Sequence, residues 1–332
     1  MKYSFELIAE LPLVADGSDS GTPGATARLA ERFKYDGILI FYNHRQLDPW
    51  ILTSALLERT ERITPLIALQ PYTMPPFSTA KAISSIARLH QRRVDLNIIA
   101  GANKSELEQV GDAESHDERY KRAVEYSSIV RNLLSSADPL DFEGRHYRFR
   151  GLQMHSYVEP EFRPKIFIAG SSPAGCAAAS RIGDVLITHP EPAAAFETDF
   201  VRSVPDGLLF GIRIGILARP TAKEAWDIAF TEYACDRAAM IQTSFKQSSE
   251  SAWSRRLAKL AIDGDIYDDV YWMGAFRSTK GSFPLLVGSY AEVTSYLARY
   301  LDAGTSAILL GGTYTAEEFQ HVRIVLRGLR GW

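Results

Sequence analysis

The chain has 332 residues, 46% of them hydrophobic, so it can bury a large core, and its length fits one barrel-like domain as well as two domains. Its 37 basic and 40 acidic residues give a formal net charge of -3, which excludes the strong positive field of a nucleic-acid or anionic-membrane binder. A small-molecule partner is therefore favoured.

The sequence shows no sign of export or membrane insertion. Glu6 and Glu10 interrupt the amino-terminal apolar run, and no small-residue cleavage pattern follows it. No stretch approaches the roughly 18 uninterrupted apolar residues of a membrane span. Cys176 and Cys235 are too few for a disulfide framework and are expected to be buried thiols in a reducing compartment. We therefore expect a cytoplasmic protein without a membrane partner.

The first part of the chain repeats a strand, a loop and a helix. Asp48 and Pro49 form a typical helix start, because Asp caps the free N–H groups and Pro is tolerated in the first turn. The expected strand, loop and helix ranges are 3–11, 16–24 and 25–34, then 37–41, 42–46 and 48–60, then 63–69, 70–76 and 78–90.

A fourth strand is expected at residues 94–99, where apolar residues show little helical periodicity. It leads into Ala100, Gly101 and Ala102, a bend with almost no side-chain bulk. A planar ligand could lie directly against the backbone there, although an ordinary strand-to-loop turn explains the same residues.

The same alternation continues to the end of the chain. A helix at 116–134 and a surface hairpin at 141–151, with Gly144 at its turn, precede strands at 165–169, 184–188, 208–217 and 307–310. Between the last two strands, residues 237–285 show no strand pattern and are long enough for a mobile lid over an active site. Eight strand-helix alternations without a composition break predict one α/β domain over residues 1–332, a closed (β/α)8 TIM barrel with an insertion before its last strand.

The stretch IFIAGSSPAG, residues 166–175, predicts a phosphate site at a strand-to-helix junction. Ser171 and Ser172 offer hydroxyls where free backbone N–H groups and the helix dipole attract an anion. A plain serine N-cap is the alternative. Neither G-x-G-x-x-G nor G-x-x-x-x-G-K-[ST] occurs, so a dinucleotide fingerprint or a P-loop is not indicated.

Three charged or titratable residues stand out as candidates for a role in the site. Arg213 lies inside an apolar strand, where it either clamps an anionic group or pairs with an internal carboxylate. Arg277, near Lys280, either serves the site from the expected lid or belongs to a solvated loop. His44 follows the second strand and is a candidate for proton transfer, with a surface histidine as the alternative.

Other catalytic classes have no support. The histidines are far apart in sequence, no cluster has metal-ligand spacing, and no metal site is expected. The G-x-S-x-G elbow of serine hydrolases does not occur. These absences favour cofactor chemistry in a barrel enzyme.

Motifs along nearly the whole chain resemble those of the luciferase-like flavin-dependent monooxygenases, in particular the alkanesulfonate monooxygenase branch. The resemblance rests on the order and spacing of DGILI, LIALQPYTMPP, RVDLNIIAG, HDERY, DFEGRHY, FIAGSSPAG, FGIRIGILARPTAKEAW, LVGSYAEV and ILLGGTY. It implies a TIM barrel that binds reduced FMN as co-substrate and forms a flavin peroxide with O2. It also implies a separate NAD(P)H-dependent flavin reductase and a homodimer or homotetramer.

The resemblance implies roles for individual residues. Ser171 and Ser172 would hold the FMN phosphate with help from Tyr120, and a non-proline cis peptide is expected near Ala68 and Leu69. The residues implied to line the isoalloxazine ring are Leu69, Gln70, Asn97 and Ala100.

Arg213 and Arg277 match positions that serve the peroxide or an anionic substrate in the sulfonate branch. His44 or Tyr314 would move protons, and residues 237–285 match the mobile insertion that shields the site from water.

Departures from the sulfonate branch leave the substrate open. Gly215 replaces a histidine two residues after Arg213, Gln46 replaces a cysteine, and Tyr314 lies one position beyond the expected tyrosine. The leading prediction is therefore an FMNH2-dependent monooxygenase acting on a small organic substrate, and not an alkanesulfonate enzyme. The alternatives are a deazaflavin (F420)-dependent oxidoreductase and a non-catalytic flavin-binding protein.

Overall fold

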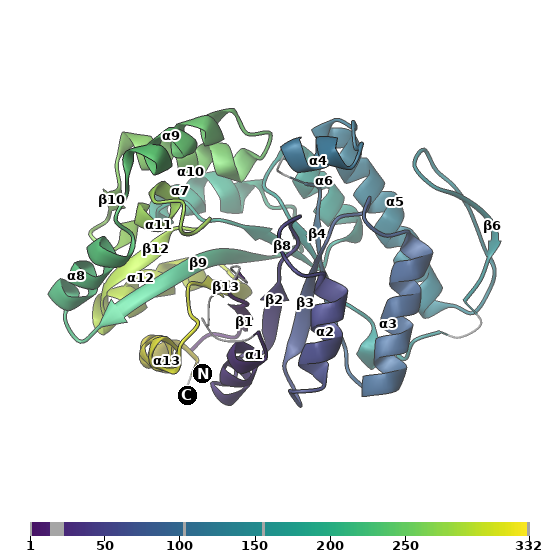
Figure 1. Ribbon diagram of the computed structural model, residues 1–332, viewed down its shortest axis with the longest axis horizontal. Helices are drawn as coiled ribbons and strands as arrows, with labels where there is room; N and C mark the ends of the chain where they lie inside the picture. The colour runs from purple at the N-terminus through teal and green to yellow at the C-terminus, as the bar shows by residue number, and fades with distance from the viewer. Residues whose placement is uncertain (1, 14–22, 102–103, 155–156, 331–332) are drawn as a thin grey trace.

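The computed structural model describes residues 2–13, 23–101, 104–154 and 157–330, and these form a closed barrel of parallel strands with helices around it (Figure 1). β1 pairs with β2 on one edge and with β13 on the other, and β9 pairs with both β8 and β13, which closes the ring. The barrel strands are β1 Glu6–Glu10, β2 Gly37–Ile40, β3 Thr64–Leu69, β4 Asp95–Ile99, β7 Ile166–Ala169, β8 Val185–Thr188, β9 Leu209–Arg219 and β13 Ala307–Gly311. The predicted TIM barrel is confirmed.

The strands are apolar on both faces because both faces are covered. In β1, Ile8 packs inside the barrel, whereas Leu7 and Ala9 pack outward against the helices. In β3, Ala68 belongs to the inner cluster and Leu69 to the outer one. Parallel strands buried in this way form continuous apolar runs.

The helices predicted at 25–34, 48–60 and 78–90 are present as α1 Pro23–Arg32, α2 Pro49–Leu57 and α3 Pro76–His90, with ends shifted by up to three residues. Asp48 accepts hydrogen bonds from the N–H groups of Trp50 and Ile51 and caps α2, with Pro49 in the first turn. The helices outside the insertion are α1 Pro23–Arg32, α2 Pro49–Leu57, α3 Pro76–His90, α4 Lys104–Gln109, α5 His116–Ser135, α6 Pro173–Ile182, α7 Ala193–Ala195, α8 Ala222–Glu232, α12 Tyr290–Asp302 and α13 Ala316–Arg330. Irregular helical turns, η1 Pro160–Phe162, η2 Phe196–Phe200 and η3 Val201–Ser203, supplement them.

The predicted surface hairpin is present beside α5. Strands β5 Leu140–Glu143 and β6 Arg148–Leu152 pair antiparallel, and the Gly144 N–H bonds the carbonyl of Tyr147 across the turn. It projects at the right of Figure 1.

The insertion is more structured than predicted. It contains α9 Arg237–Phe245, η4 Lys246–Ser248, α10 Ala252–Asp263, β10 Ile266–Tyr267, β11 Tyr271–Trp272 and α11 Gly274–Arg277. The prediction that residues 237–285 contain no strand was therefore wrong. β11 pairs with β12 Leu285–Ser289, which lies parallel to the outer part of β9. β10 and β11, with two residues each, are too short for period-two alternation to reveal them.

Three further expectations need correction or lie outside the described residues. The described peptide bonds are all trans, so the cis bond expected near Ala68 is not found, in keeping with the much lower energy of the trans form. Cys235 is exposed and Cys176 is only partly buried, so neither matches the expected buried thiol. Most of the expected loop at residues 16–24, and Ala102 of the bend, lie outside the described residues.

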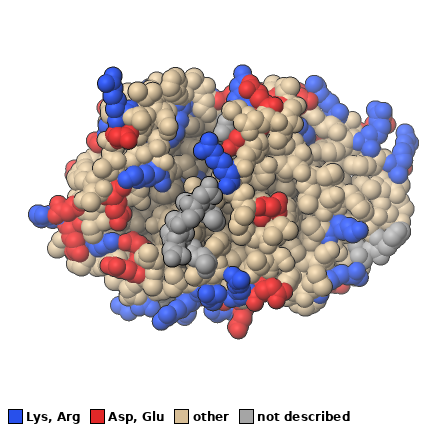
Figure 2. Space-filling view, in the orientation of Figure 1, with Lys and Arg blue, Asp and Glu red and all other residues tan. Residues whose placement is uncertain are grey.

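The surface carries no dominant charge of one sign on the face drawn in Figure 2, where basic and acidic side chains are interspersed and separated by uncharged surface. None of the helices in the described ranges combines the length and apolar character that crossing a membrane requires.

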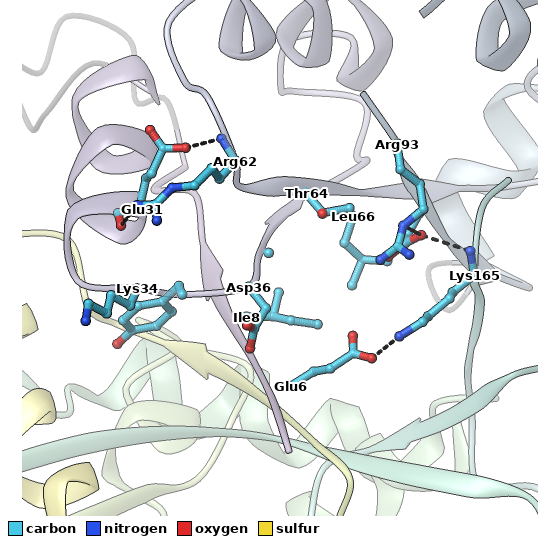
Figure 3. Close-up of a pocket in the computed structure, with 13 residues that line it drawn as sticks. Glu6, Ile8, Glu31, Lys34, Asp36, Arg62, Thr64, Leu66, Arg93 and Lys165 are labelled. Atoms are coloured by element: carbon cyan, nitrogen blue, oxygen red, sulfur yellow. Dashed lines mark hydrogen bonds and ion pairs between the residues drawn. The ribbon is translucent and has the colours of Figure 1, made fainter. Parts of the chain in front are cut away.

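A polar cavity of about 590 Å³ lies where the barrel strands begin (Figure 3). Its charged side chains are largely matched with one another. Lys165 pairs with Glu6, and Arg93 lies 3.0 Å from the Asp95 carboxylate, which also accepts the N–H of Lys165 at 2.8 Å. Polar groups at this end of a TIM barrel usually serve stability, and paired ions are consistent with that role.

Asp95 should make stability depend on pH. Burial raises the pKa of Asp95 from 3.8 to about 6, although Arg93 opposes this. Because the folded state holds the proton more tightly than the unfolded chain, the resulting stabilisation is complete below pH 3.8 and is lost as the pH rises through about 6.

The variant Asp95→Asn cannot titrate. The unfolding free energy of the wild type minus that of the variant should therefore fall by on the order of 3 kcal/mol between about pH 4 and pH 7, measured by urea denaturation. A difference that stays constant over this range would contradict the assignment.

Candidate active site

A second cavity, of about 260 Å³, lies at the opposite end of the barrel, where the strands end. Its floor is apolar and its walls carry a few polar groups, the usual composition of a small-molecule site. The residues that line it are Leu39, Phe41, Tyr42, Ala68, Asn97, Ile99, Ala100, Gly101, His116, Tyr120, Ala169, Gly170, Ser171, Ser172, Ile187, His189, Arg213, Ser251, Ala252, Trp253 and Leu309.

The junction between β7 and α6, here called the cup (Gly170, Ser171 and Ser172), lies in the cavity wall where the sequence predicts a phosphate site. Ser172 is the N-cap of α6, and its Oγ accepts the N–H of Gly175 at 3.1 Å, so the capping interpretation is correct. Ser171 lies beside it in the cavity wall, at the positive end of the helix dipole. The capping of α6 and an anion site at the same place are compatible, because Ser171 is not used by the cap.

Small residues let Tyr120 approach this cup. A Cβ on Gly170 would lie 2.1 Å from the Tyr120 hydroxyl oxygen, and one on Gly175 would lie 3.2 Å from it. The Tyr120 hydroxyl donates to the carbonyl of Ala169 at 2.9 Å. Burial raises the pKa of Tyr120 to about 12, so the hydroxyl keeps its proton and can act only as a donor or neutral acceptor at neutral pH.

The wall beyond the cup is formed by the end of β4. Asn97 is 7% exposed, and its side-chain oxygen has no hydrogen-bond partner among the described residues. A buried acceptor without a hydrogen bond lowers the free energy of unfolding by about 1–3 kcal/mol, so this oxygen indicates a place where a donor could bind. Gly101 has φ 86°, and a Cβ there would lie 2.8 Å from Leu107, so the bend needs glycine.

The buried side chain of Arg119 holds this bend through hydrogen bonds to its carbonyl groups. It is 3% exposed, and its guanidinium donates to the carbonyls of Ala100 at 2.8 Å and Gly101 at 3.2 Å. It also donates to the carbonyl of Glu114 at 2.7 Å and pairs with Glu250 of the insertion at 2.6 Å. One buried cation thus joins the end of β4, the start of α5 and the insertion.

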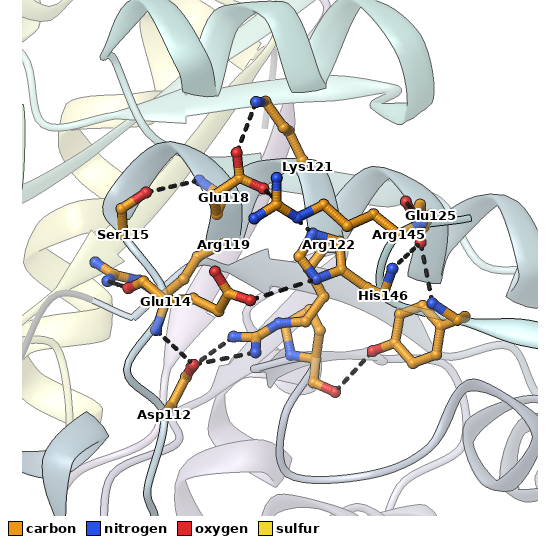
Figure 4. A network of polar contacts seen from close by, with 12 residues as sticks. Asp112, Glu114, Ser115, Glu118, Arg119, Lys121, Arg122, Glu125, Arg145 and His146 are labelled. Carbon is orange, nitrogen blue, oxygen red and sulfur yellow. Dashed lines mark hydrogen bonds and ion pairs between the residues drawn. The ribbon is translucent and has the colours of Figure 1, made fainter.

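Figure 4 shows the polar network around Arg119. Arg122 pairs with Asp112 through two hydrogen bonds, at 3.1 and 2.5 Å, and this holds the loop before α5. Glu118 contacts Lys121 and the hairpin residue Arg145. The network holds the start of α5, and with it Tyr120, against the barrel.

Arg213 is held by a carboxylate inside the barrel mouth. Its Nε and Nη2 donate to one oxygen of Glu10 at 3.0 and 2.7 Å, and the Tyr314 hydroxyl donates to the other oxygen at 3.0 Å. Burial raises the pKa of Glu10, and Arg213 opposes that rise. Burial and the Glu10 charge raise the pKa of Tyr314, so Tyr314 remains protonated. Internal pairing of Arg213, one of the two predicted alternatives, is therefore confirmed.

Arg213 nevertheless reaches the cavity. Its Nη1 lies 3.4 Å from His189 Nε2 and donates to Ser282 at 2.9 Å, and its guanidinium lies over the ring of Phe41. Burial, Arg213 and Arg256 lower the pKa of His189 well below 6.5, so this imidazole is neutral at neutral pH. Its ring stacks on Trp253 of the insertion at a centroid distance of 3.9 Å.

Several predicted site residues lie outside the cavity lining. His44 bonds Gln109 at 3.2 Å and packs edge-on against Tyr42, which does line the cavity. Arg277 pairs with Asp265 inside the insertion at 2.6 Å, so the structure does not bring it to Arg213.

Leu69 points outward into the core, and Ala68 takes the place in the lining that the sequence assigned to Leu69. Gln70 is buried at the end of β3 with its side-chain oxygen unpartnered in the described part of the chain. The predicted residues that do meet in the cavity are Asn97, Ala100, Tyr120, Ser171, Ser172 and Arg213.

Sequence patterns did not reveal some residues of the site. Glu10 carried a usable signal, a carboxylate inside an apolar strand, but its partner across the barrel could not be inferred. His189 follows a predicted strand directly and was accessible to the same reasoning as His44. Trp253 and Arg256 lie in the insertion, where no strand periodicity indicated their position.

Comparisons with known proteins agree with this geometry. Residues 17–307 match the family model of the luciferase-like monooxygenases. The chain is 40% identical over 306 residues, 91% of this chain and 89% of the relative, to 4-(gamma-L-glutamylamino)butanoyl-[BtrI acyl-carrier protein] monooxygenase BtrO of Niallia circulans.

Two solved structures share the fold. EDTA monooxygenase from Chelativorans sp. BNC1 superposes with a TM-score of 0.79 at 19% identity, covering 98% of this chain and 94% of that one. The oxygenating constituent of 3,6-diketocamphane monooxygenase of Pseudomonas putida, in complex with FMN, gives 0.67 at 18% identity, with 98% and 97% covered. The sequence matches show that this chain belongs to the luciferase-like monooxygenase family and is an enzyme, a flavin-dependent monooxygenase.

Proposed function

We propose that the enzyme uses reduced FMN, with its phosphate in the cup at Ser171 and Ser172 and its ring against Asn97 and Ala100. The proposal rests on two features of one cavity. The start of α6 attracts an anion, and the side-chain oxygen of Asn97 has no hydrogen-bond partner among the described residues. The unpartnered oxygen of Asn97 suits a ring N–H. The bend at Ala100 and Gly101 carries little side-chain bulk and lies in the same cavity lining, which suits a planar ring.

When bound, reduced FMN would activate O2 for transfer of one oxygen atom to the substrate. The protein would supply orientation and charge. Arg213, locked by Glu10, presents its Nη1 at the cavity, where it would stabilise negative charge that develops there. His189 is neutral and adjacent, so it would accept a proton, as a weak base, while the protonated Tyr314 would hold Glu10 in place through its hydrogen bond.

This assignment changes the proposed proton carriers. His189 lines the cavity, whereas His44 contacts it only through Tyr42. Arg277 would support the insertion by its pair with Asp265 and would not bind an anionic substrate. The insertion at residues 237–285 would act as a lid that shields the activated oxygen from water.

The proposal includes partners that the family uses. A separate NAD(P)H-dependent reductase would deliver reduced FMN, and the enzyme would work as a homodimer or homotetramer. The 40% identical relative acts on an acyl chain carried by an acyl-carrier protein. We therefore propose a small organic substrate with an acyl group, and the first two candidates to compare are an acyl chain on a carrier protein and the corresponding free acid.

Turnover tests the cofactor and the reaction together. With reduced FMN, O2 and a suitable acyl substrate, oxygen uptake should yield a monooxygenated product, measured by oxygen electrode and mass spectrometry. Anaerobic titration with F420 should show weaker binding than with FMN. Tighter binding of F420 would support a deazaflavin oxidoreductase, and flavin oxidation at the same rate with and without protein would indicate a non-catalytic binder.

The Glu10 and Arg213 pair can be removed as a unit. Glu10→Gln combined with Arg213→Gln avoids leaving one buried charge unpaired, which single changes would do at a cost of about 3–5 kcal/mol. We expect kcat to fall by about 100-fold or more, because the positive charge at the cavity is lost. The FMN dissociation constant should change much less, since neither residue contacts the cup. A kcat close to that of the wild type would refute this role for Arg213.

A further inference from the structure

The insertion docks on the barrel mouth through three residues spaced three apart, Glu250, Trp253 and Arg256. Glu250 pairs with Arg119, and Trp253 stacks on His189. Arg256 pairs with Glu191, which follows β8 and is 5% exposed. Glu250 lies just before α10, whose N-cap is Ser251, and Trp253 and Arg256 lie in the first turns of the helix, so one side of this segment faces the barrel mouth.

Arg256 also reaches the cup. Its Nη1 donates to Ser171 Oγ at 2.9 Å, and its Nη2 lies 3.4 Å from Thr188 Oγ1. Its Nε is used separately, in the pair with Glu191. Two of its nitrogens therefore point at neutral hydroxyls, which are weaker acceptors for a guanidinium than phosphate oxygens are.

A phosphate in the cup would place oxygens beside these two nitrogens. Arg256 could exchange its hydroxyl partners for phosphate oxygens while its Nε keeps Glu191, so no buried charge would lose its partner. The planar fork of arginine suits this geometry better than the single ammonium of lysine. Besides Arg256, the described residues at the cup offer the hydroxyls of Ser171, Ser172 and Tyr120, and the imidazole of His116 lies beside Tyr120 in the same lining.

We propose that Arg256 is a phosphate-recognition residue that the insertion supplies to the cup, and that it makes the enzyme prefer FMN over riboflavin. This inference rests on the proposed FMN function and deepens it. Binding of the phosphate would also hold the start of α10 against the barrel, since the same side chain belongs to the insertion. Cofactor binding and closure of the insertion are thereby linked.

Riboflavin separates phosphate recognition from ring binding, because it has the same ring and no phosphate. The variant Arg256→Gln should weaken FMN binding by about 10- to 100-fold, the effect of losing one or two charge-assisted hydrogen bonds. Its riboflavin affinity should stay close to that of the wild type. Arg255→Gln is the matched control, because this exposed neighbour on α10 loses the same charge away from the cup, and both affinities should be unchanged. Titration calorimetry measures both ligands.

The double variant Glu191→Gln with Arg256→Gln guards against misfolding, because it leaves no unpaired carboxylate, and it should show the same selective loss of FMN affinity. A second readout is tryptic cleavage within residues 237–285. FMN should slow cleavage of the wild type, riboflavin should do so less, and FMN should lose its advantage in Arg256→Gln.

Equal weakening of FMN and riboflavin, or no weakening of either, would overturn the role of Arg256 while leaving the FMN proposal intact. A wild type that binds neither flavin would overturn both.

Discussion

The buried guanidinium of Arg119 is the contact on which the shape of the site depends most. It bonds two carbonyls at the bend after β4, a third carbonyl before α5, and the Glu250 carboxylate of the insertion. Burying a charge without partners costs several kcal/mol of folding free energy. Arg119 can therefore be buried only when these segments come together around it. The flat bend, the position of Tyr120 and the docking of the insertion all follow from that requirement.

The two ends of the barrel differ in how their polar groups are satisfied. Where the strands begin, Glu6, Lys165, Arg93 and Asp95 are paired with one another. Where they end, the Asn97 oxygen has no partner among the described residues, and two nitrogens of Arg256 contact hydroxyls while its Nε pairs with Glu191. Polar groups that fold unsatisfied or weakly satisfied gain most from a ligand. The smaller cavity therefore has the chemistry of a binding site, although the cavity at the opposite end is larger.

The sequence predicted the barrel and much of the cup because both depend on local patterns. Apolar runs followed by small residues located the strands, and Ser172 with Pro173 located the start of α6. Across-barrel pairing is not local, and so Glu10 could not be assigned to Arg213. The resemblance implied Leu69 as a lining residue, whereas Ala68 lines the cavity, and the apolar run could not decide between them because a strand buried on both faces gives no signal for which side chains point inward. β12 was missed since a run of only three apolar residues, Leu285 to Val287, fits a strand or a helix equally well.

The central claim is that the start of α6 binds the phosphate of FMN through Ser171 and Ser172. The most direct measurement is the FMN dissociation constant of the variant carrying Ser171→Asp and Ser172→Asp, beside that of the wild type. Aspartate can still cap α6, so the fold should survive, while its charge repels a phosphate. The account predicts a loss of at least about 100-fold in FMN affinity. An affinity equal to that of the wild type would contradict it.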